Sequence, residues 1–290
     1  MYWLGFWCVI GLSALFYFVG PTNIEKYFDK NTNKLEVYVL DVGQGDAIFI
    51  ETPDDYQILI DGGPDKNVLY ELGKVMGFWD RSIDAVVLTH PHSDHVGGMV
   101  EVLRRYQIDK VYMTGVVHTS SDYLTFLNVV NEKDIPVHEV SESFVLNLDN
   151  DINFEFLYPL QSFARLRVEN LNNTSIVNRL VYNDTSILLT GDLETEGEEE
   201  LIASNQDLSV DILKAGHHGS STSSKDEFLI TVRPDYAVIS VGNDNSFGHP
   251  SSRTLKRMER LGVKVFRTDQ QGMITLISDG LNWQIEPGLK

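Results

Sequence analysis

The chain of 290 residues contains a single cysteine, Cys8. An intrachain disulfide and a zinc site built from several cysteines are therefore excluded. Glycine (22 residues) and proline (9 residues) are too scarce for collagen-like or low-complexity structure. A hydrophobic fraction of 42%, with 22% charged residues, also excludes a disordered chain. These absences leave one large globular domain or two small ones.

Basic residues are also scarce, because 23 Lys and Arg face 42 Asp and Glu and the net charge is −19. Such a surface repels polyanions, so any contact with nucleic acid must rest on a local basic patch. Residues 250–268 hold six basic side chains and one acid, Glu259. Four of the six follow helical spacing and would share one helix face, namely Arg253, Lys256, Arg257 and Arg260. Lys256 and Arg257 are therefore candidate substrate contacts; the alternative is a solvated face paired with nearby acids.

The first 20 residues lack charged side chains between Tyr2 and Gly20, a run of 19 residues. A helix of that length spans roughly 30 Å, the thickness of a hydrocarbon core. The segment predicts a single transmembrane helix at 1–20 and a polar linker at 21–34, so we expect a cell-membrane protein. A cleavable signal peptide is the alternative, although the segment has neither a basic start nor a small-residue cleavage site. The lysines that follow the segment weakly favour a cytoplasmic domain.

Beyond the linker, short apolar runs alternate with helical patterns. Strands are predicted at 35–40, 47–51, 57–60, 85–88, 110–113, 209–213, 236–241, 264–267 and 273–277. Helices are predicted at 68–76, 95–106, 123–131, 194–203 and 251–261. The stretch 144–190 has strand character, with a hairpin around Asn183 and Asp184. Because no interior linker interrupts this pattern, we expect residues 35–290 to form one α/β domain.

The strongest motif is HPHSDH at residues 90–95, which follows the apolar strand AVVLT and precedes two glycines. It places His90, His92, Asp94 and His95 at one strand end. Imidazole and carboxylate groups are common metal ligands, so the motif predicts a metal site. The alternative is a polar loop with incidental histidines.

Two later strand ends offer partners for this motif. Asp192 follows the apolar strand 186–190 and a glycine, and its carboxylate could bridge two metal ions. The strand VDILK runs into the sequence GHHGS, which contains His217 and His218 and predicts a second ligand loop.

The order and spacing of these motifs resemble the metallo-β-lactamase fold. The segments LDVGQGDAIFIE, ILIDGG, LTHPHSDHVGG, NNTSIV, LLTGD, DILKAGHHGSSTS, YAVISVGNDNSFGHP and RTDQQG resemble the C-terminal domain of the ComEC competence proteins. The resemblance covers roughly residues 36–280. Full ComEC proteins also carry a multi-span channel region and a small β-barrel domain, which have no counterpart in these 290 residues. A separately encoded uptake channel is therefore an expected partner.

The resemblance implies a four-layer βα/αβ sandwich with two divalent metal ions, zinc or manganese, at its edge. The side chains that it assigns to the ions are His90, His92, Asp94, His95 and Asp192. His90 and His92 would hold the first ion, and Asp192 would bridge the two. The GHHGS loop would complete the second site. The choice between His217 and His218 stays open, with His217 favoured because it comes first after the strand.

One position departs from the broader fold, in which a histidine commonly lies roughly 20 residues before the bridging aspartate. Residues 172–175 read NNTS instead. An oxygen of Asn173, or a water, in place of that imidazole would favour manganese over zinc. ComEC-like domains share this pattern. The alternative for Asn173 is a turn residue, and His118 and His138 are other candidates for the missing ligand.

Several polar residues beside the motifs are predicted to support the site. Asp61 closes the strand QILI, and a ligating histidine usually donates its second N–H to such a carboxylate. Asp41 and Asp46 match the family motif but could simply form a turn. The resemblance places His249 against the metals, where it would contact a phosphate or leaving group. The other candidate substrate contacts are Ser220, Ser221 and Lys214.

Together these features predict a metal-dependent phosphodiesterase, most simply a nuclease that acts on DNA during uptake. The residues expected to act in catalysis are Asp94, Asp61 and His249. The alternatives are a hydrolase of a lactone, thioester or phosphorylcholine ester, and a non-catalytic subunit of an uptake channel. The resemblance places the catalytic domain outside the cytoplasmic membrane, whereas the lysines that follow the apolar segment weakly favour a cytoplasmic domain.

Overall fold

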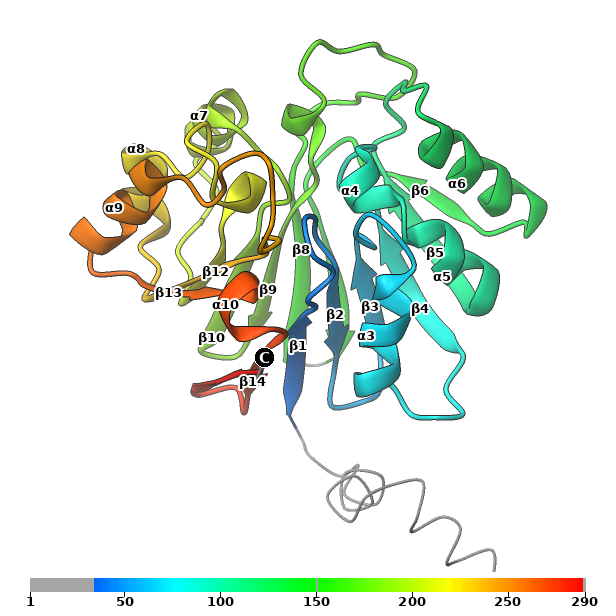
Figure 1. Cartoon of the computed structure of the whole chain (residues 1–290), viewed down its shortest axis with the longest axis horizontal. Helices are drawn as coiled ribbons and strands as arrows, with labels where there is room; N and C mark the ends of the chain where they lie inside the picture. Colours follow the sequence, from blue (N-terminus) through cyan, green and yellow to red (C-terminus); the bar gives the residue numbers. More distant parts are fainter. Residues whose placement is uncertain (1–33, 150, 289–290) are drawn as a thin grey trace, which may run out of the picture. The chain divides into compact units, whose positions relative to one another are not determined.

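The protein was analysed as a computed structural model that describes residues 34–149 and 151–288 (Figure 1). The predicted membrane helix at 1–20 and the linker up to residue 33 lie outside the described residues. Among the helices of 34–149 and 151–288, none combines the length and the apolar character needed to cross a bilayer.

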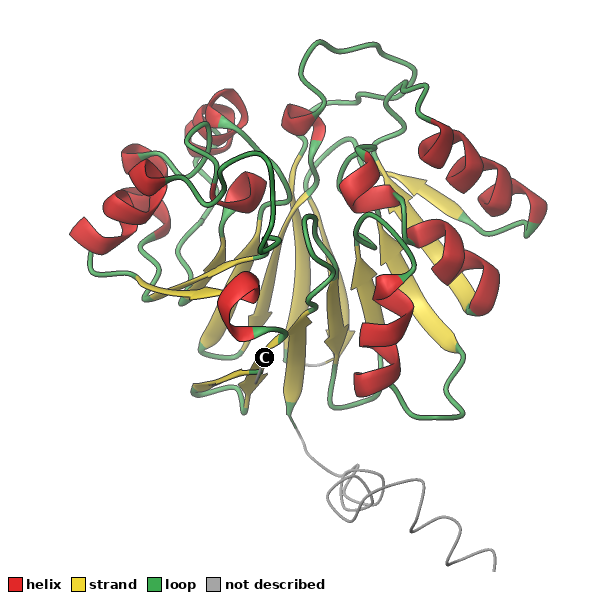
Figure 2. Ribbon diagram, in the orientation of Figure 1, coloured by secondary structure: helices red, strands yellow, loops and turns green. Residues whose placement is uncertain are grey.

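Two sheets form the centre of the domain (Figure 2). Across the first sheet the strands are β15 (Trp283–Pro287), β14 (Ile274–Ser278), β1 (Leu35–Val39), β2 (Ile48–Glu51), β3 (Gln57–Ile60), β4 (Ser82–Val87), β5 (Gln107–Met113) and β6 (Val137–Glu139). Across the second they are β13 (Lys264–Arg267), β12 (Tyr236–Ile239), β11 (Ile212–Lys214), β10 (Thr185–Leu189), β9 (Val177–Tyr182), β8 (Ile152–Tyr158) and β7 (Phe144–Asp149).

Helices cover the outer face of each sheet (Figures 1 and 2). The first sheet carries α3 (Asn67–Val75), α4 (Ser93–Val96), α5 (Met99–Arg105) and α6 (Ser121–Glu132). The second carries α7 (Thr195–Ala203), α8 (Asp226–Val232) and α9 (Ser252–Arg260). The shorter elements are α10 (Thr268–Gln271) and the 3-10 turns η1 (Asn172–Thr174) and η2 (Gly216–Gly219).

Three apolar clusters join these layers. One lies between the two sheets and includes Phe154 and Ile187. The other two lie between each sheet and its helices, around Phe126 on one side and Phe228 on the other. Fully burying a side chain of this size stabilises the fold by about 1.5–3 kcal/mol. The layer order is therefore helix, sheet, sheet, helix, and the predicted four-layer sandwich is confirmed.

The three metal motifs lie at the carboxyl ends of parallel strands. Strands β3 to β6 run parallel to one another, and β10 to β13 do the same in the second sheet. The HPHSDH loop follows β4, Asp192 follows β10, and the GHHGS loop follows β11. The paired sheets thus bring three sequence-distant loops to one edge of the sandwich.

Glycine lets two neighbouring turns approach the HPHSDH loop. A Cβ atom added to Gly45, where φ is 136°, would lie 2.1 Å from the carbonyl oxygen of Asp94. A Cβ added to Gly98 would lie 2.0 Å from the carbonyl oxygen of Gly62. No other residue type fits at either position without moving the backbone.

The largest difference from the predicted elements is at 95–106, which is two helices rather than one. The N–H of Gly98 donates to the carbonyl of Gly63 at 2.9 Å, so the chain turns between α4 and α5. The sequence reading also missed α8 and the edge strand β15. Strand β15 has its burial set by its pairing with β14, which a local pattern cannot show.

Candidate metal centre

Four side chains from the three loops form one cluster, namely Asp94, His95, Asp192 and His218. One ligand atom of each lies within 4.8 Å of the others. His218 Nε2 is 3.3 Å from Asp94 Oδ2 and 3.4 Å from Asp192 Oδ2. His95 Nε2 is 3.3 Å from the same oxygen of Asp192. Only Asp94 is partly exposed, so the cluster is sealed on its protein side.

Three buried atoms of this cluster fit a cation. Within the described residues, His95 Nε2, His218 Nε2 and Asp192 Oδ1 have no hydrogen-bond partner. Leaving a buried polar atom unpaired costs about 1–3 kcal/mol. The other ring nitrogens are held, since His95 Nδ1 lies 2.7 Å from Asp61 Oδ2 and His218 Nδ1 lies 3.0 Å from the Ser240 carbonyl. With protons on Nδ1, both Nε2 lone pairs point at Asp192, as in a metal site.

The electrostatics of the cluster also favour positive charge. Burial alone would lower the pKa of His218, but the charges of Asp192 and Asp46 overcome it and raise that pKa to about 10. Burial would raise the pKa of the Asp192 carboxyl, yet His218 and His95 hold it well below its usual range. The buried carboxylates therefore stabilise protons on the imidazoles or a divalent ion between them.

His90 and His92 lie beside this cluster. His90 Nε2 is 3.0 Å from His92 Nδ1 and 3.9 Å from Asp192 Oδ2. Burial, followed by the charge of His95, lowers the pKa of His90 well below its usual range. A neutral imidazole is the form that binds a metal ion. His118 lies further out, with its ring centroid 6.2 Å from that of His92.

His138 is remote from these side chains. It lies on β6, exposed to solvent, and its ring packs against Tyr112 and Phe144. It is therefore not the missing ligand.

The structure does not place Asn173 among the ligands. Its side-chain oxygen accepts the Glu194 N–H at 3.0 Å, and its amide nitrogen donates to Glu196 at 3.0 Å. Ser175, which the sequence reading missed, is closer to the cluster. Its hydroxyl accepts the Asp192 N–H at 3.1 Å and lies 3.3 Å from His90 Nδ1. The one sequence signal for Ser175 as a site residue is its position in the NNTS stretch.

The geometry favours His218 over His217, contrary to the preference drawn from their order. His217 Nε2 is 3.8 Å from Asp192 Oδ2, and its Nδ1 lies 3.0 Å from Glu194 Oε1. Both histidines have left-handed backbones, with φ of 47° and 52°. This conformation costs roughly 1–2 kcal/mol per residue, and such strain concentrates at functional sites. Glu194 is a second site residue that sequence reasoning missed.

Lys214 is not a substrate contact. Its side chain is completely buried, and Nζ donates to Asp46 Oδ2 at 2.7 Å and to the Ala215 carbonyl at 2.9 Å. Asp46 in turn lies 3.3 Å from His218 Nδ1, so this turn residue belongs to the support of the cluster. An ion pair sealed in this way cannot reach a substrate.

The remaining candidates lie around the edge of the cluster. The ring of His249 stacks on Phe247 and has its centroid 5.4 Å from that of His217. Ser220 is buried, and its hydroxyl lies 2.9 Å from the Thr222 hydroxyl within its own loop. Ser221 beside it is half-buried.

Helix α9 does not present four free cations on one face. Arg257 donates to the carbonyls of Ser223 and Ser224, and Arg260 pairs with Asp226. Lys256 is exposed. The helix therefore uses Arg257 and Arg260 within the fold, and Lys256 remains a candidate contact.

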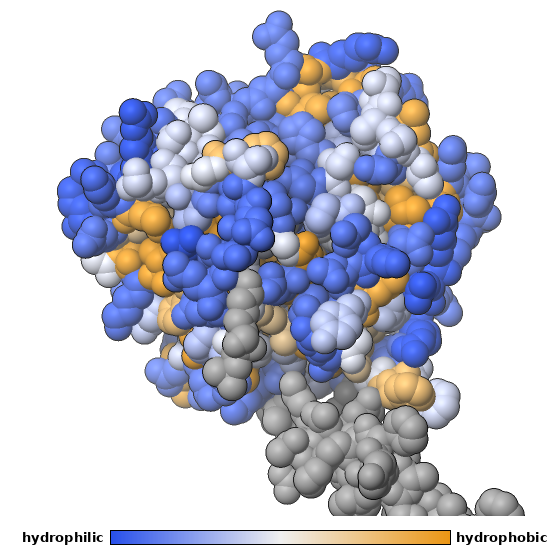
Figure 3. All heavy atoms as spheres, viewed as in Figure 1, coloured by the Kyte–Doolittle hydropathy of each residue, from blue (hydrophilic) through white to orange (hydrophobic). Residues whose placement is uncertain are grey.

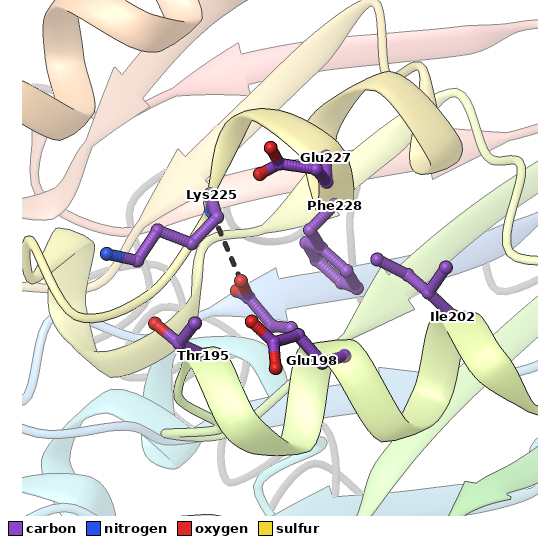
Figure 4. Close-up of a pocket in the computed structure, with 7 residues that line it drawn as sticks. Thr195, Glu198, Ile202, Lys225, Glu227 and Phe228 are labelled. Atoms are coloured by element: carbon purple, nitrogen blue, oxygen red, sulfur yellow. Dashed lines mark hydrogen bonds between the residues drawn. The ribbon is translucent and has the colours of Figure 1, made fainter.

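A small cavity between α7 and α8 is separate from these residues. It is lined by Thr195, Glu198, Glu199, Ile202, Lys225, Glu227 and Phe228 (Figure 4). None of the predicted metal ligands lines it.

Comparison with known proteins agrees with this architecture. The family model of the metallo-β-lactamase superfamily matches residues 40–243. ComE operon protein 3 of Bacillus subtilis is 32% identical over 82% of this chain and 32% of its own length. Competence protein ComA of Neisseria gonorrhoeae is 30% identical over 83% of this chain and 32% of its own. The chain thus spans about a third of the length of these relatives.

A solved structure shows the same fold. Igni18, described as a metallo hydrolase from Ignicoccus hospitalis, has a TM-score of 0.54 at 18% identity and covers 83% of this chain and 98% of its own. The family match, the paired sheets and the buried cluster suited to divalent metal ions agree. The chain therefore belongs to the metallo-β-lactamase superfamily and is a metal-dependent hydrolase related to competence proteins.

Proposed function

We propose that this protein is a membrane-anchored phosphodiesterase that uses two divalent metal ions to hydrolyse DNA during uptake. The observation that carries the proposal is the buried cluster around Asp192, with three unpartnered ligand atoms, in a chain related to competence proteins. The chain matches about a third of the length of those relatives, and their names support a role in DNA uptake.

The proposed ligands divide between two positions around Asp192. His90 and His92 would hold one ion, Asp94, His95 and His218 would hold the other, and Asp192 would contact both. Two bound divalent ions supply hydroxide near neutral pH and stabilise charge on the phosphate oxygens.

The protein's own side chains orient the ligands and receive the leaving group. Asp61 fixes the ring of His95, while the Ser175 hydroxyl lies between His90 and the backbone of Asp192. His249, at the edge of the cluster, would donate a hydrogen bond or a proton to the leaving oxygen.

We propose manganese rather than zinc as the metal that supports turnover best. The position where the broader fold commonly has a third histidine offers an oxygen atom here. Asn172 Oδ1 is buried and unpaired within the described residues. Oxygen ligands suit manganese, whereas imidazole suits zinc.

The proposed location is the cell membrane, with residues 1–20 as a single anchor and 21–34 as a linker. The catalytic domain, residues 35–290, would lie outside the cytoplasm, next to a DNA-uptake channel. The uncharged run of 19 residues and the competence relatives support this arrangement.

The decisive experiment incubates the purified full chain with single- and double-stranded DNA and a panel of divalent metals. We expect cleavage of DNA and of a small phosphodiester, with manganese giving the faster turnover. Asp192→Asn should lose at least about a hundredfold in rate and bind fewer ions, whereas the exposed control Asp109→Asn should match the wild type. Turnover of a lactone or thioester without phosphodiester cleavage would instead identify a small-ester hydrolase.

A further inference from the structure

The loop between β8 and η1, residues 159–171, passes near the edge of the domain that carries the metal motifs, at the top of the view in Figure 1. It is pinned to the segment that follows β5. The Val117 N–H donates to the Leu166 carbonyl at 2.9 Å, and the Arg165 N–H donates to the Gly115 carbonyl at 3.0 Å. These two bonds give the loop a fixed position.

Both ends of this arrangement reach the metal cluster. On one side, Val117 is followed by His118, whose ring centroid is 6.2 Å from that of His92. On the other side, the loop runs through η1 to Ser175, whose hydroxyl lies 3.3 Å from His90 Nδ1. The loop therefore forms part of the border of the site.

This border carries two exposed guanidinium groups, Arg165 and Arg167. Within the described residues neither has an ion pair or a side-chain hydrogen bond, whereas four other arginines pair with carboxylates, namely Arg104, Arg179, Arg260 and Arg267. The only acid in the loop sequence is Glu169. In a chain with a net charge of −19, two such groups beside the cluster are a local positive region.

The loop around these two arginines is exposed and has one unusual backbone angle. Arg165 has a φ of 61°, in the left-handed region that residues other than glycine rarely adopt. Leu166, between the two arginines, is 51% exposed. Figure 3 shows hydrophilic side chains over this edge of the molecule, with some apolar atoms between them.

We propose that Arg165 and Arg167, here called the arginine rim, bind phosphate groups of a nucleic-acid strand next to the bond that is cleaved. This inference rests on the proposed phosphodiesterase function and adds the residues that hold a polymeric phosphodiester outside the metal cluster. Guanidinium groups bind phosphate oxygens in a bidentate way. Because the rim lies on an exposed loop outside the buried cluster, it contacts a substrate that extends beyond the cluster. A small ester held at the metals does not need it.

The test compares two variants of the full chain with the same change in net charge. One is Arg165→Glu with Arg167→Glu. The matched control is Arg104→Glu with Arg105→Glu, exposed residues at the end of α5, which lies at the edge opposite the metal motifs because β5 starts there. DNA affinity is measured by fluorescence anisotropy in EDTA over a range of salt concentrations.

We expect the rim variant to lose about two phosphate contacts. For single-stranded DNA the slope of log K against log salt should flatten by about 1.4, and for duplex DNA by about 1.8. The control should keep the wild-type slope. Arg165→Lys with Arg167→Lys should also keep most of the wild-type salt slope, because lysine preserves the positive charge. This variant therefore separates the effect of charge from an effect of substitution on loop folding. Hydrolysis of a small phosphodiester should be unchanged in all variants.

Two results would overturn the inference, and they are distinguishable. If the rim and control variants have equal salt slopes while the wild type still cleaves DNA, the arginine rim does not bind phosphate and the proposed function still stands. A wild type that neither binds nor cleaves DNA, while it hydrolyses a small ester, would remove both.

Discussion

At the residue scale, the candidate site depends on how each histidine uses its two ring nitrogens. The Nδ1–H group of His95 donates to Asp61, and its Nε2 atom faces Asp192. Asp61 is completely buried and also accepts bonds from the Thr89 hydroxyl, at 2.6 Å, and the Thr89 N–H, at 2.8 Å. This carboxylate therefore has one orientation, and that orientation fixes the imidazole.

We predict that Asp61→Asn weakens metal binding by about 10- to 100-fold, the usual effect of removing such a partner. An amide at this position can present its nitrogen to His95 and favour the wrong tautomer. Competition with a chromophoric chelator measures the affinity. Asp54→Asn, in an exposed turn, is the control. Unchanged affinity in Asp61→Asn would mean that this carboxylate does not set the orientation of His95.

The buried pair of Lys214 and Asp46 gives a second prediction at this scale. Lys214→Met leaves the Asp46 carboxylate buried without its ammonium partner, which should destabilise the fold by about 3–5 kcal/mol. Urea unfolding measures the loss, and the exposed Lys66→Met should change stability by less than about 0.5 kcal/mol. Since the ammonium is sealed from solvent, the salt dependence of DNA binding should not change. A flatter salt slope with full stability would restore Lys214 as a substrate contact.

At the scale of elements, helices α7 and α8 meet around a buried acid, Glu198. Its carboxylate accepts the N–H of Lys225 (Figure 4) and the N–H of Ser224. Burial nevertheless raises the pKa of Glu198 to about 7. The charged form is therefore less favoured in the folded protein than in the unfolded chain.

This shift predicts a pH dependence of stability. Because the folded pKa lies above the unfolded value of about 4.3, the folded state binds more protons between these values. The contribution of Glu198 is therefore present at low pH and is lost as the pH rises toward 7, by up to about 3 kcal/mol. Unfolding titrations at pH 5 and pH 7 should show a smaller difference for Glu198→Gln than for the wild type. The exposed neighbour Glu199→Gln should behave as the wild type, and a matching effect there would contradict the assignment.

Helix α9 yields a prediction that separates its basic residues. Lys256→Glu should flatten the salt slope of DNA binding by about one phosphate contact, because that side chain is exposed on the helix that follows the His249 loop. Arg257→Glu should instead lower the free energy of unfolding by about 1–3 kcal/mol, because it loses bonds to two carbonyls. Salt titration and urea unfolding of both variants measure this. Equal effects on the salt slope would return both residues to one DNA-binding face.

At the scale of the whole molecule, a feature could be predicted from the sequence where it depends on residues close together in the chain, and not where it depends on distant ones. The ligand motifs follow apolar strands, so local pattern predicts His90, whereas Asp192 is predicted only in combination with the HPHSDH and GHHGS motifs. The choice of His218 depends on the left-handed backbone of His217 and His218, a conformation that residues other than glycine adopt uncommonly. The burial of Lys214 depends on Asp46, a partner 168 residues away in the turn between β1 and β2 of the other sheet. Membrane anchoring, which rests on 1–20, stays a prediction.

The last prediction concerns the net charge of −19. Self-repulsion among surface carboxylates opposes the compact state, and salt screens it over a Debye length that falls from about 30 Å at 0.01 M to about 8 Å at 0.15 M. Moderate sodium chloride should therefore raise the melting temperature of the full chain by a few degrees, where each kcal/mol is worth roughly 2–4 °C. Potassium chloride should give the same rise in melting temperature at equal ionic strength. Sucrose at equal osmolarity should not reproduce the dependence on salt concentration, because it does not screen charge. A melting temperature that falls with added salt would mean that local ion pairs, such as Arg179 with Glu155, outweigh the repulsion of the whole surface.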